Sequence, residues 1–395
     1  MRSELSGHQL PFNKARSELK KMISVVEVKT KKQQREFLNF PLVLYKNAPC
    51  FCPPLYGDEK KIFKADYVYY DRCEAVYYNA YENGVMVGRI SGILQKAHNE
   101  KTGEKRVRFT RFDSINDQKV ADALFEAVEK WAVSKGMDTV CGPLGFSDLE
   151  REGLLTKGFD QMSTFEEQYN YEYYQTLIES RGYTKEAVWN ESRIYAPDQH
   201  DEKLRRLAQV IMKRYKLRYG QAKNVNDFIK KYGDAFFELL DKSYADIYGT
   251  VPFTDGMKKM LISNFKLIVD LRYVCVVLDE NDRLVCLGLC FPSISAAVRK
   301  SNGHLTPVAL ARLLKAVKKP RVIDFGLVGV DPEYANRGIG ALVTVPIMDI
   351  LEKGNIEYAE TNLNLVGNAQ IQNMWNRFNR VIHKERCSYI KKLEV

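Results

Sequence analysis

The stretch from Val322 to Ala341 has the residue types and the spacing with the clearest chemical use. It reads VIDFGLVGVDPEYANRGIGA, with Gly338 and Gly340 just before an apolar helical run and Arg337 adding a positive charge. Glycines let a backbone approach a phosphate closely, the first N–H groups of a helix are unpaired, and the helix dipole favours an anion. The stretch therefore predicts a site for a phosphate-bearing ligand.

The elements that must position this loop follow from hydrophobic periodicity. Val322 to Val330 is apolar apart from Asp324 and two glycines, which predicts a buried strand. Asp331-Pro332 marks a turn, and Ile339 to Leu351 repeats apolar residues at helical spacing. The loop lacks the Gly-Lys-Ser/Thr of a Walker motif and the three glycines of a dinucleotide fingerprint. It is either an anion-binding loop or only a tight strand-to-helix turn.

This strand, loop and helix resemble the acyl-CoA-binding motif of the GNAT (N-acetyltransferase) superfamily, in which a strand leads into R/Q-x-x-G-x-G/A. Gly338 and Gly340 match the glycines, whereas Ala335 replaces the leading Arg or Gln. The resemblance implies acetyl-CoA or a longer acyl-CoA as co-substrate. The cofactor contacts that it implies are Leu327, Val328, Gly329, Val330, Arg337, Gly338, Ile339, Gly340, Ala341 and Asn368.

Acyl transfer to an amine needs a base that keeps the amine neutral and an acid for the leaving thiolate. Glu360 and Asp324 are the candidate bases, because a carboxyl group in an apolar strand acquires a raised pKa. The alternative for both residues is a surface or hydrogen-bonded carboxylate at a strand end, and the alternative for Asn368 is an ordinary helix N-cap. Trp375 stands where many members of the superfamily carry an acidic tyrosine, and indole cannot release a proton at a useful pKa.

The length of 395 residues predicts more than one domain, and the same order of elements occurs in both halves. We expect an α/β (α+β) fold with two GNAT-like domains, each a mixed, partly parallel sheet flanked by helices. The first would span residues 23–195 and the second 214–395, with a linker and helix at 196–213. The first half has Asp113 to Asp117, without glycine, where its loop should lie, so we expect only the second domain to bind CoA.

Periodicity and turn residues also predict the remaining elements. Asn83-Gly84 is typical of a hairpin, and Pro41 is expected to end a helix that starts near Thr30. The expected strands cover 23–29, 74–81, 85–94, 106–112, 139–142, 186–195, 216–222, 272–278, 283–291, 357–363 and 386–392. The expected helices cover 117–135, 165–180, 202–214, 224–248, 307–317 and 369–378.

The net charge of +10 is concentrated at the start of the chain, where the first 35 residues hold nine basic and three acidic residues. Residues 1–22 would form a basic arm, either a solvated tail or a contact for an anionic membrane or nucleic acid. No apolar run reaches the length of a membrane span and no signal-peptide core is present, so we expect a cytoplasmic protein. The eight cysteines and five histidines show no metal-ligand spacing, so we expect no metal.

Three functions compete. The first is an acyl-CoA-dependent N-acyltransferase acting on a small-molecule or peptide amine. The second is a transferase similar to the Fem-type aminoacyl-tRNA enzymes, favoured by the basic charge but lacking a heptad run; only this alternative requires a nucleic acid. The third is a non-catalytic binding protein on the same scaffold, favoured by Trp375. Two tyrosine-rich stretches, 67–81 and 169–174, are candidates for an acceptor groove or for half-buried structural residues.

Overall fold

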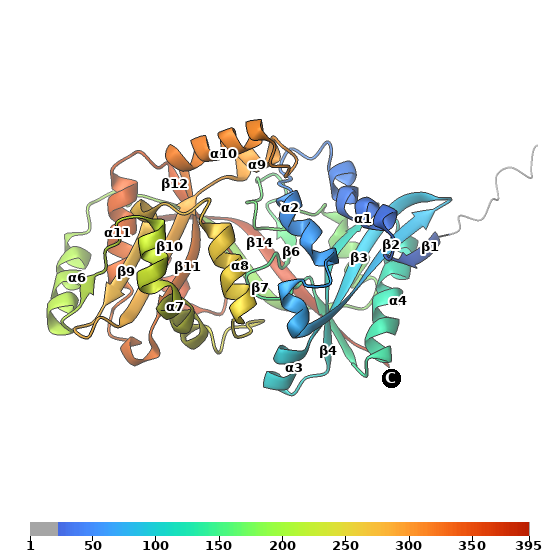
Figure 1. Cartoon of the computed structure of the whole chain (residues 1–395), viewed down its shortest axis with the longest axis horizontal. Helices are drawn as coiled ribbons and strands as arrows, with labels where there is room; N and C mark the ends of the chain where they lie inside the picture. Colours follow the sequence, from blue (N-terminus) through green and yellow to red (C-terminus); the bar gives the residue numbers. More distant parts are fainter. Residues whose placement is uncertain (1–22, 395) are drawn as a thin grey trace, which may run out of the picture.

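The strand expected at 322–330 is strand β11, Val322–Val330, in a computed structural model that describes residues 23–394. It belongs to one mixed, 14-stranded sheet with helices on both faces (Figure 1). The other strands are β1 Ile23–Glu27, β2 Cys73–Glu82, β3 Val85–Gln95, β4 Arg106–Ser114, β5 Thr139–Gly142, β6 Leu154–Lys157, β7 Thr184–Tyr195, β8 Arg218–Tyr219, β9 Val274–Leu278, β10 Leu284–Pro292, β12 Tyr358–Thr361, β13 Asn364–Leu365 and β14 Asn379–Lys392.

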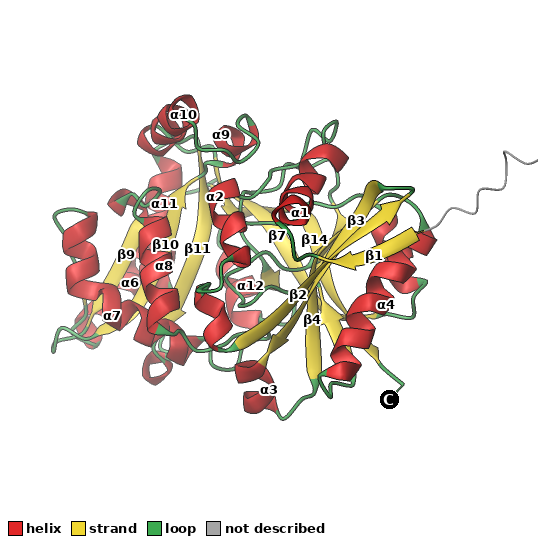
Figure 2. Ribbon diagram, turned by 45° about the vertical axis from the view of Figure 1, so that its right-hand side comes forward, coloured by secondary structure: helices red, strands yellow, loops and turns green. Residues whose placement is uncertain are grey.

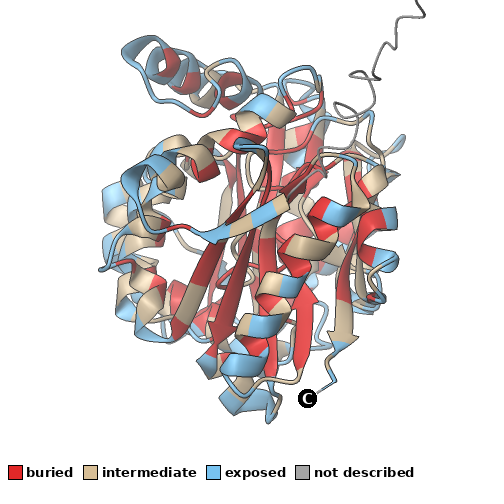
Figure 3. Cartoon of the chain, turned by 90° about the vertical axis from the view of Figure 1, so that its right-hand side faces the viewer, coloured by how far each residue is buried: buried red, intermediate tan, exposed pale blue. Residues whose placement is uncertain are grey.

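The helices cover both faces of this sheet, and most strand residues are buried between them (Figures 2 and 3). They are α1 Lys31–Leu44, α2 Tyr56–Glu59, α3 Lys96–Thr102, α4 Gln118–Ser134, α5 Tyr173–Glu179, α6 Glu202–Arg214, α7 Val225–Ser243, α8 Asp255–Phe265, α9 Ser295–Arg299, α10 Pro307–Lys318, α11 Ala341–Glu352 and α12 Ala369–Trp375. In the second half, α6 and α11 share one apolar core, while α7 packs into another that contains Leu327.

Strands β7 and β14 join the two halves of the sheet, because they pair antiparallel along most of their length. The end of β14 also pairs with β5 of the first half, with Tyr389 opposite Gly142. The end of β7 pairs with β12 of the second half, with Ile194 opposite Ala359. Each half therefore contains a strand segment from the other half. The domain boundaries expected from the sequence remain a prediction, and the basic arm at 1–22 lies outside the described residues.

Helix α1 continues through Pro41 to Leu44, so the expectation that Pro41 ends the helix was wrong. Proline lacks the N–H that would bond to the carbonyl oxygen four residues earlier. That oxygen belongs to Phe37, and it accepts a hydrogen bond of 2.9 Å from Nη1 of Arg89 instead. A long-range guanidinium thus satisfies the carbonyl group that proline leaves unpaired.

The helix expected at 165–180 is also too long, since α5 covers only Tyr173–Glu179. The preceding residues are held by distant partners. Oδ1 of Asn170 accepts from the backbone N of Leu155 at 2.8 Å, and Nδ2 of Asn170 donates to the backbone O of Leu155 at 3.0 Å. The hairpin between β2 and β3 is confirmed: its turn residues Asn83 and Gly84 both have positive φ, 51° and 82°.

Candidate functional site

Strands β11 and β12 separate partway along β11. Their parallel pairing runs from Val322 opposite Tyr358 to Phe325 opposite Thr361. Beyond Phe325, β11 stays paired with β10 on its other edge, up to Val330 opposite Cys286. The predicted cofactor contacts Leu327, Val328, Gly329 and Val330 therefore lie on β11 beside this opening. A strand edge without a partner strand leaves backbone groups for other hydrogen bonds.

A tyrosine from α7's C-terminal end occupies part of this edge. The hydroxyl of Tyr244 donates to the backbone O of Val328 at 3.1 Å and lies 3.4 Å from its backbone N. Burial raises the pKa of Tyr244, so the group is a neutral hydroxyl at physiological pH. Tyr244 was not predicted from the sequence, because its position beside β11 depends on a contact with Val328, 84 residues away in the chain.

The glycine loop connects β11 to α11. Gly338 has a φ of +75°, a backbone conformation that favours glycine. Among residues 23–394, the backbone N–H groups of Gly338, Ile339 and Gly340 have no protein acceptor. A Cβ atom at Gly340 would meet no heavy atom within 4 Å, so the space beside the loop is open. Unpaired donors at a helix start with space beside them are suited to an anion.

Arg337 and Ala341 flank these donors. The guanidinium of Arg337 lies over the rings of Tyr215 and Tyr334, 5.4 and 5.1 Å from their centres. Within the described part of the chain it has no carboxylate partner, which leaves its charge available to a ligand. Ala341 is the first residue of α11 and donates its N–H to the carbonyl oxygen of Gly338 at 3.0 Å.

The corresponding loop of the first half is built differently. Asp117 caps α4, and its Oδ1 accepts from the backbone N of Lys119 at 2.9 Å. A carboxylate therefore occupies the helix start where an anionic ligand would need donors, and it would repel a phosphate. The expectation that the first half does not bind CoA remains a prediction.

The two predicted bases lie opposite each other, because Asp324 on β11 pairs in register with Glu360 on β12. Glu360 accepts a hydrogen bond of 2.5 Å at its Oε1 from Nε2 of His383 and lies 3.6 Å from Nε of Arg193. Burial raises the pKa of Asp324 well above its usual range, and the charge of Glu360 adds to the shift while Ser293 opposes it. Burial therefore disfavours the ionised form of Asp324.

A third carboxyl group, Glu166, belongs to the same cluster and was not predicted. Burial raises the pKa of Glu166 to about 7, with a further contribution from the charge of Glu167. Nδ2 of Asn362, which follows β12, donates to Oε2 of Glu166 at 3.3 Å. Glu166 thus comes from the first half of the chain and contacts the second half beside the opening between β11 and β12.

Glu166 also lines a cavity of about 170 Å³ in the first half. Arg111 in this cavity pairs with Glu59, and Arg89 pairs with Asp113 at 2.7 Å. Arg151 donates to the backbone O of Cys52 at 3.4 Å but has no carboxylate partner among residues 23–394. The lining residues are Pro41, Tyr45, Phe51, Pro54, Glu59, Arg89, Thr110, Arg111, Asp113, Leu149, Glu150, Arg151, Glu166, Gln168 and Tyr169. This polar cavity can hold a ligand with both charged and apolar parts.

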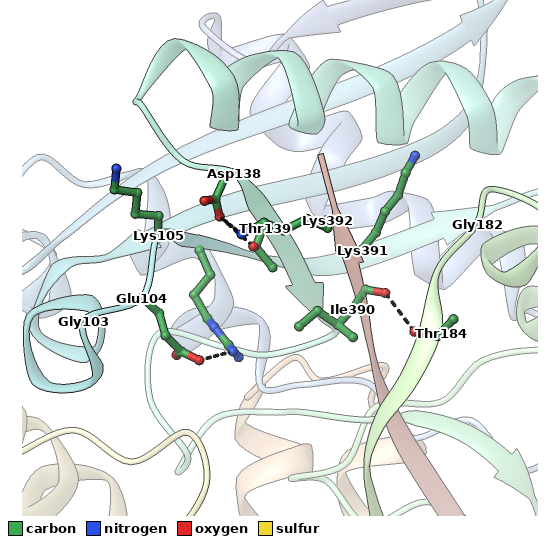
Figure 4. Close-up of a pocket in the computed structure, with 11 residues that line it drawn as sticks. Gly103, Glu104, Lys105, Asp138, Thr139, Gly182, Thr184, Ile390, Lys391 and Lys392 are labelled. Atoms are coloured by element: carbon green, nitrogen blue, oxygen red, sulfur yellow. Dashed lines mark hydrogen bonds and ion pairs between the residues drawn. The ribbon is translucent and has the colours of Figure 1, made fainter. Parts of the chain in front are cut away.

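A larger hollow, about 770 Å³, lies near the end of β14 and is shown in Figure 4. Most of its cationic side chains are already paired. Nη1 of Arg106 lies 3.0 Å from Glu186, and Nζ of Lys392 lies 2.8 Å from Asp138. Because these charges are neutralised within the protein, the hollow is poorly suited to a phosphate.

The last predicted contacts lie in α12. Asn368 caps this helix, and its Oδ1 accepts from the backbone N of Ile371 at 3.3 Å. Its role in cofactor binding therefore remains a prediction. Trp375 is fully buried, and its Nε1 donates to Oδ1 of Asn364 at 2.6 Å. The indole has a structural role, packing edge-on against Phe325 with ring centres 4.7 Å apart.

Solved structures with the same arrangement of elements identify the fold. A tandem GNAT protein from the clavulanic acid biosynthesis pathway superposes with a TM-score of 0.54 at 9% identity, covering 95% of this chain and 99% of that chain. A GCN5-related N-acetyltransferase from Sphaerobacter thermophilus gives 0.50 at 10% identity, covering 94% and 96%. The prediction of a tandem GNAT-like fold is confirmed.

Two curated proteins are similar in sequence. Protein YghO of Escherichia coli (strain K12) is 26% identical over 377 residues, which cover 92% of this chain and 94% of that protein. A bacterial ceramide synthase of Caulobacter vibrioides (strain NA1000 / CB15N) is 26% identical over 344 residues, covering 85% and 86%. No family model matches the chain. Among residues 23–394, no helix is both long enough and apolar enough to cross a bilayer.

Proposed function

We propose that the protein is an acyl-CoA-dependent N-acyltransferase whose second half holds the CoA. One observation carries this proposal: the unpaired N–H groups of Gly338, Ile339 and Gly340 lie at the end of the loop that joins α11 to the strand that separates from β12. The loop would hold the pyrophosphate, with Arg337 adding charge. The free edge of β11 at Leu327 to Val330 would hold the pantetheine arm, with Ala341 and Asn368 at its margins. Acyl-CoA supplies a thioester carbonyl as the electrophile.

The residues around the opening would then polarise and protonate the reacting groups. Backbone N–H groups on β11, that of Val328 among them, would donate to the carbonyl oxygen as charge develops there. Tyr244 would donate its hydroxyl proton to the leaving thiolate. Trp375 on α12 cannot supply this proton, because indole is not an acid at a useful pKa. With Tyr244 in this role, the acid would come from the C-terminal end of α7 instead. Tyr244 has to leave the backbone of Val328 for both groups to act.

The cluster of Asp324, Glu360 and Glu166 would receive the acceptor amine. The oxygen atoms of these carboxyl groups can accept hydrogen bonds from an ammonium ion, and the amine must lose a proton before it can attack the carbonyl carbon. Glu166 is the best proton acceptor of the three, because its pKa of about 7 leaves it partly ionised near neutral pH. Glu360, fixed by His383, would orient the amine.

The similarity to a ceramide synthase suggests the first substrates to assay. Ceramide formation joins a fatty acyl group to the amine of a long-chain amino alcohol. We therefore propose a fatty acyl-CoA as donor and an amino alcohol as acceptor. The cavity that Glu166 lines offers this carboxyl group for the amine of such an acceptor and rings such as Tyr169 for part of its carbon chain.

The proposed activity is tested by following the release of the CoA thiol with acetyl-CoA or a long-chain acyl-CoA and a panel of amines. The account predicts turnover that needs both substrates and is lost in a Gly340→Val variant. Acyl-CoA that remains intact with every amine, in a protein that binds CoA, would support a non-catalytic binding protein instead.

A further inference from the structure

The segment from Ser293 to Arg321, which contains α9 and α10, forms an unusual part of the surface. Figures 1 and 2 place α10 at the upper edge of the molecule. Only two side chains of α10, Ala309 and Leu313, are fully buried against the rest of the protein. The segment is thus held at one side and presents the other side outward.

The outward side is strongly basic. The segment contains seven lysine and arginine residues and no aspartate or glutamate. All seven are exposed: Arg299, Lys300, Arg312, Lys315, Lys318, Lys319 and Arg321. In the described part of the chain, Arg321 pairs with Glu357, and the other six have no carboxylate within salt-bridge distance. This concentration of unpaired positive charge requires a negative partner or bulk counter-ions.

Large apolar side chains are exposed among these cations. The exposed fractions are 48% for Leu305, 61% for Val308, 37% for Leu310 and 47% for Leu314. The outer face of a helix on a globular protein normally carries polar residues. Here exposed leucine and valine side chains lie among arginine and lysine side chains, so the outer face combines apolar and cationic groups.

We propose that this segment docks the protein on an anionic lipid bilayer. Apolar side chains of such a helix enter the boundary between headgroups and acyl chains, while lysine and arginine contact anionic headgroups. A nucleic acid would use the charge but would leave the four apolar side chains in water. The combination of both kinds of group favours a lipid surface. The proposal does not depend on the reaction that the protein catalyses.

A hollow beside α9 would connect a docked bilayer with the cavity that contains Glu166. It has a volume of about 460 Å³ and lies between α9 and the end of α1, with Lys46, Arg299 and Lys300 at its wall. Tyr45 and Phe51 line both this hollow and the cavity that contains Glu166. An amphiphile leaving the bilayer at α10 would therefore meet a basic hollow next to the carboxyl cluster.

Co-sedimentation of the full chain with vesicles tests the docking. The wild-type protein should bind vesicles of mixed phosphatidylglycerol and phosphatidylcholine and bind pure phosphatidylcholine vesicles much more weakly. A Val308→Ser/Leu314→Ser variant should lose at least about tenfold in affinity for the mixed vesicles. An Arg312→Gln/Lys315→Gln/Lys318→Gln variant should lose roughly 100-fold, since each cation near such a surface contributes about 1 kcal/mol.

Helix α6 supplies the matched control. Its Leu207 and Val210 are 46% and 59% exposed and also lie among basic residues. A Leu207→Ser/Val210→Ser variant should bind like the wild type. The proposal is overturned if the wild-type protein does not bind the mixed vesicles, if either α10 variant binds them as well as the wild type, or if the α6 variant loses as much affinity as the α10 variants.

Discussion

The hydroxyl of Tyr244 bonds to the backbone of Val328, 3.1 Å from its O and 3.4 Å from its N, on the free edge of β11. This contact joins α7 to the strand edge where the thioester is proposed to lie. It places a proton donor beside the proposed thioester site, although Trp375 stands where the resemblance to the GNAT superfamily implies a tyrosine.

The first prediction concerns this donor. A Tyr244→Phe variant should lower kcat about 100-fold while the KM for acyl-CoA changes little, because a general acid acts on the transition state and not on binding. Tyr219→Phe is the matched control, since that hydroxyl also donates to a backbone carbonyl, of Leu342 at 3.0 Å. Steady-state kinetics of both variants give the comparison. A Tyr244→Phe enzyme with wild-type kcat would remove the proposed acid.

The second prediction concerns pH. The pKa of Glu166 is raised to about 7, so below that pH Glu166 is protonated and cannot accept a proton. We expect kcat/KM to rise with pH and to level off above about 7. A Glu166→Gln variant should lower kcat/KM and remove its rise with pH. A Glu172→Gln variant, which changes an exposed carboxylate, should keep the wild-type kcat/KM and its rise with pH.

The same shift affects stability with a defined sign. The pKa of Glu166 is higher in the folded state than the ordinary value of 4.5. The stabilising contribution of Glu166 to the free energy of unfolding is therefore fully present below pH 4.5 and is lost as pH rises through about 7. Glu166→Gln should therefore flatten this fall in unfolding free energy. In the kinetic experiment, an unchanged pH–rate profile of Glu166→Gln would contradict the assignment of Glu166 as the proton acceptor and favour Glu360.

The third prediction concerns the proline within α1. Arg89 is 6% exposed, pairs with Asp113 at 2.7 Å and satisfies the carbonyl oxygen of Phe37. Arg89→Met should lower the free energy of unfolding by about 3–5 kcal/mol, because it leaves the buried Asp113 carboxylate without its cation and the Phe37 carbonyl without its donor. Urea unfolding measures the loss.

Two further variants distinguish the effect of an unpaired buried carboxylate from the general effect of losing a cation. Asp113→Asn in the Arg89→Met background should recover part of the loss, since no buried charge then remains unpaired. Lys130→Met, which removes a pair with Glu126 whose lysine side chain is 75% exposed, should change stability by about 0.5 kcal/mol or less. Equal losses in Arg89→Met and Lys130→Met would contradict the explanation.

The elements with strong local patterns were predictable from the sequence. β11 was predicted with its correct bounds, and the helix after the glycine loop was placed within two residues of α11, because both depend on periodicity and turn residues. The predictions that were wrong concern residues whose conformation depends on distant partners. Pro41 lies inside a helix because Arg89 replaces a lost hydrogen bond, and Asn170 is held outside a helix by Leu155.

The candidate site was predictable in part for the same reason. Gly338 and Gly340 lie in one short segment whose spacing indicates anion binding. Tyr244 and Glu166 come from elements that meet β11 and β12 only in the folded chain, through the contacts with Val328 and Asn362. The exchange of β7 and β14 between the halves is equally non-local, and nothing in either strand's own sequence specifies it.

The glycine loop gives the sharpest binding prediction. Gly340→Val places a side chain in open space beside the unpaired N–H groups, so it should fold normally yet obstruct a phosphate. Gly57→Val is the matched control, because a Cβ there also meets no atom within 4 Å. The variant at Gly340 should weaken CoA binding at least about 100-fold, and the variant at Gly57 should bind like the wild type.

Calorimetric titration of the protein with acetyl-CoA and with a long-chain acyl-CoA measures whether the glycine loop of the second half forms a CoA site. The account predicts one equivalent bound per chain, with binding lost in Gly340→Val and kept in Gly57→Val. No binding of either ligand, or equal binding by the wild type and Gly340→Val, would contradict a CoA site at the glycine loop of the second half.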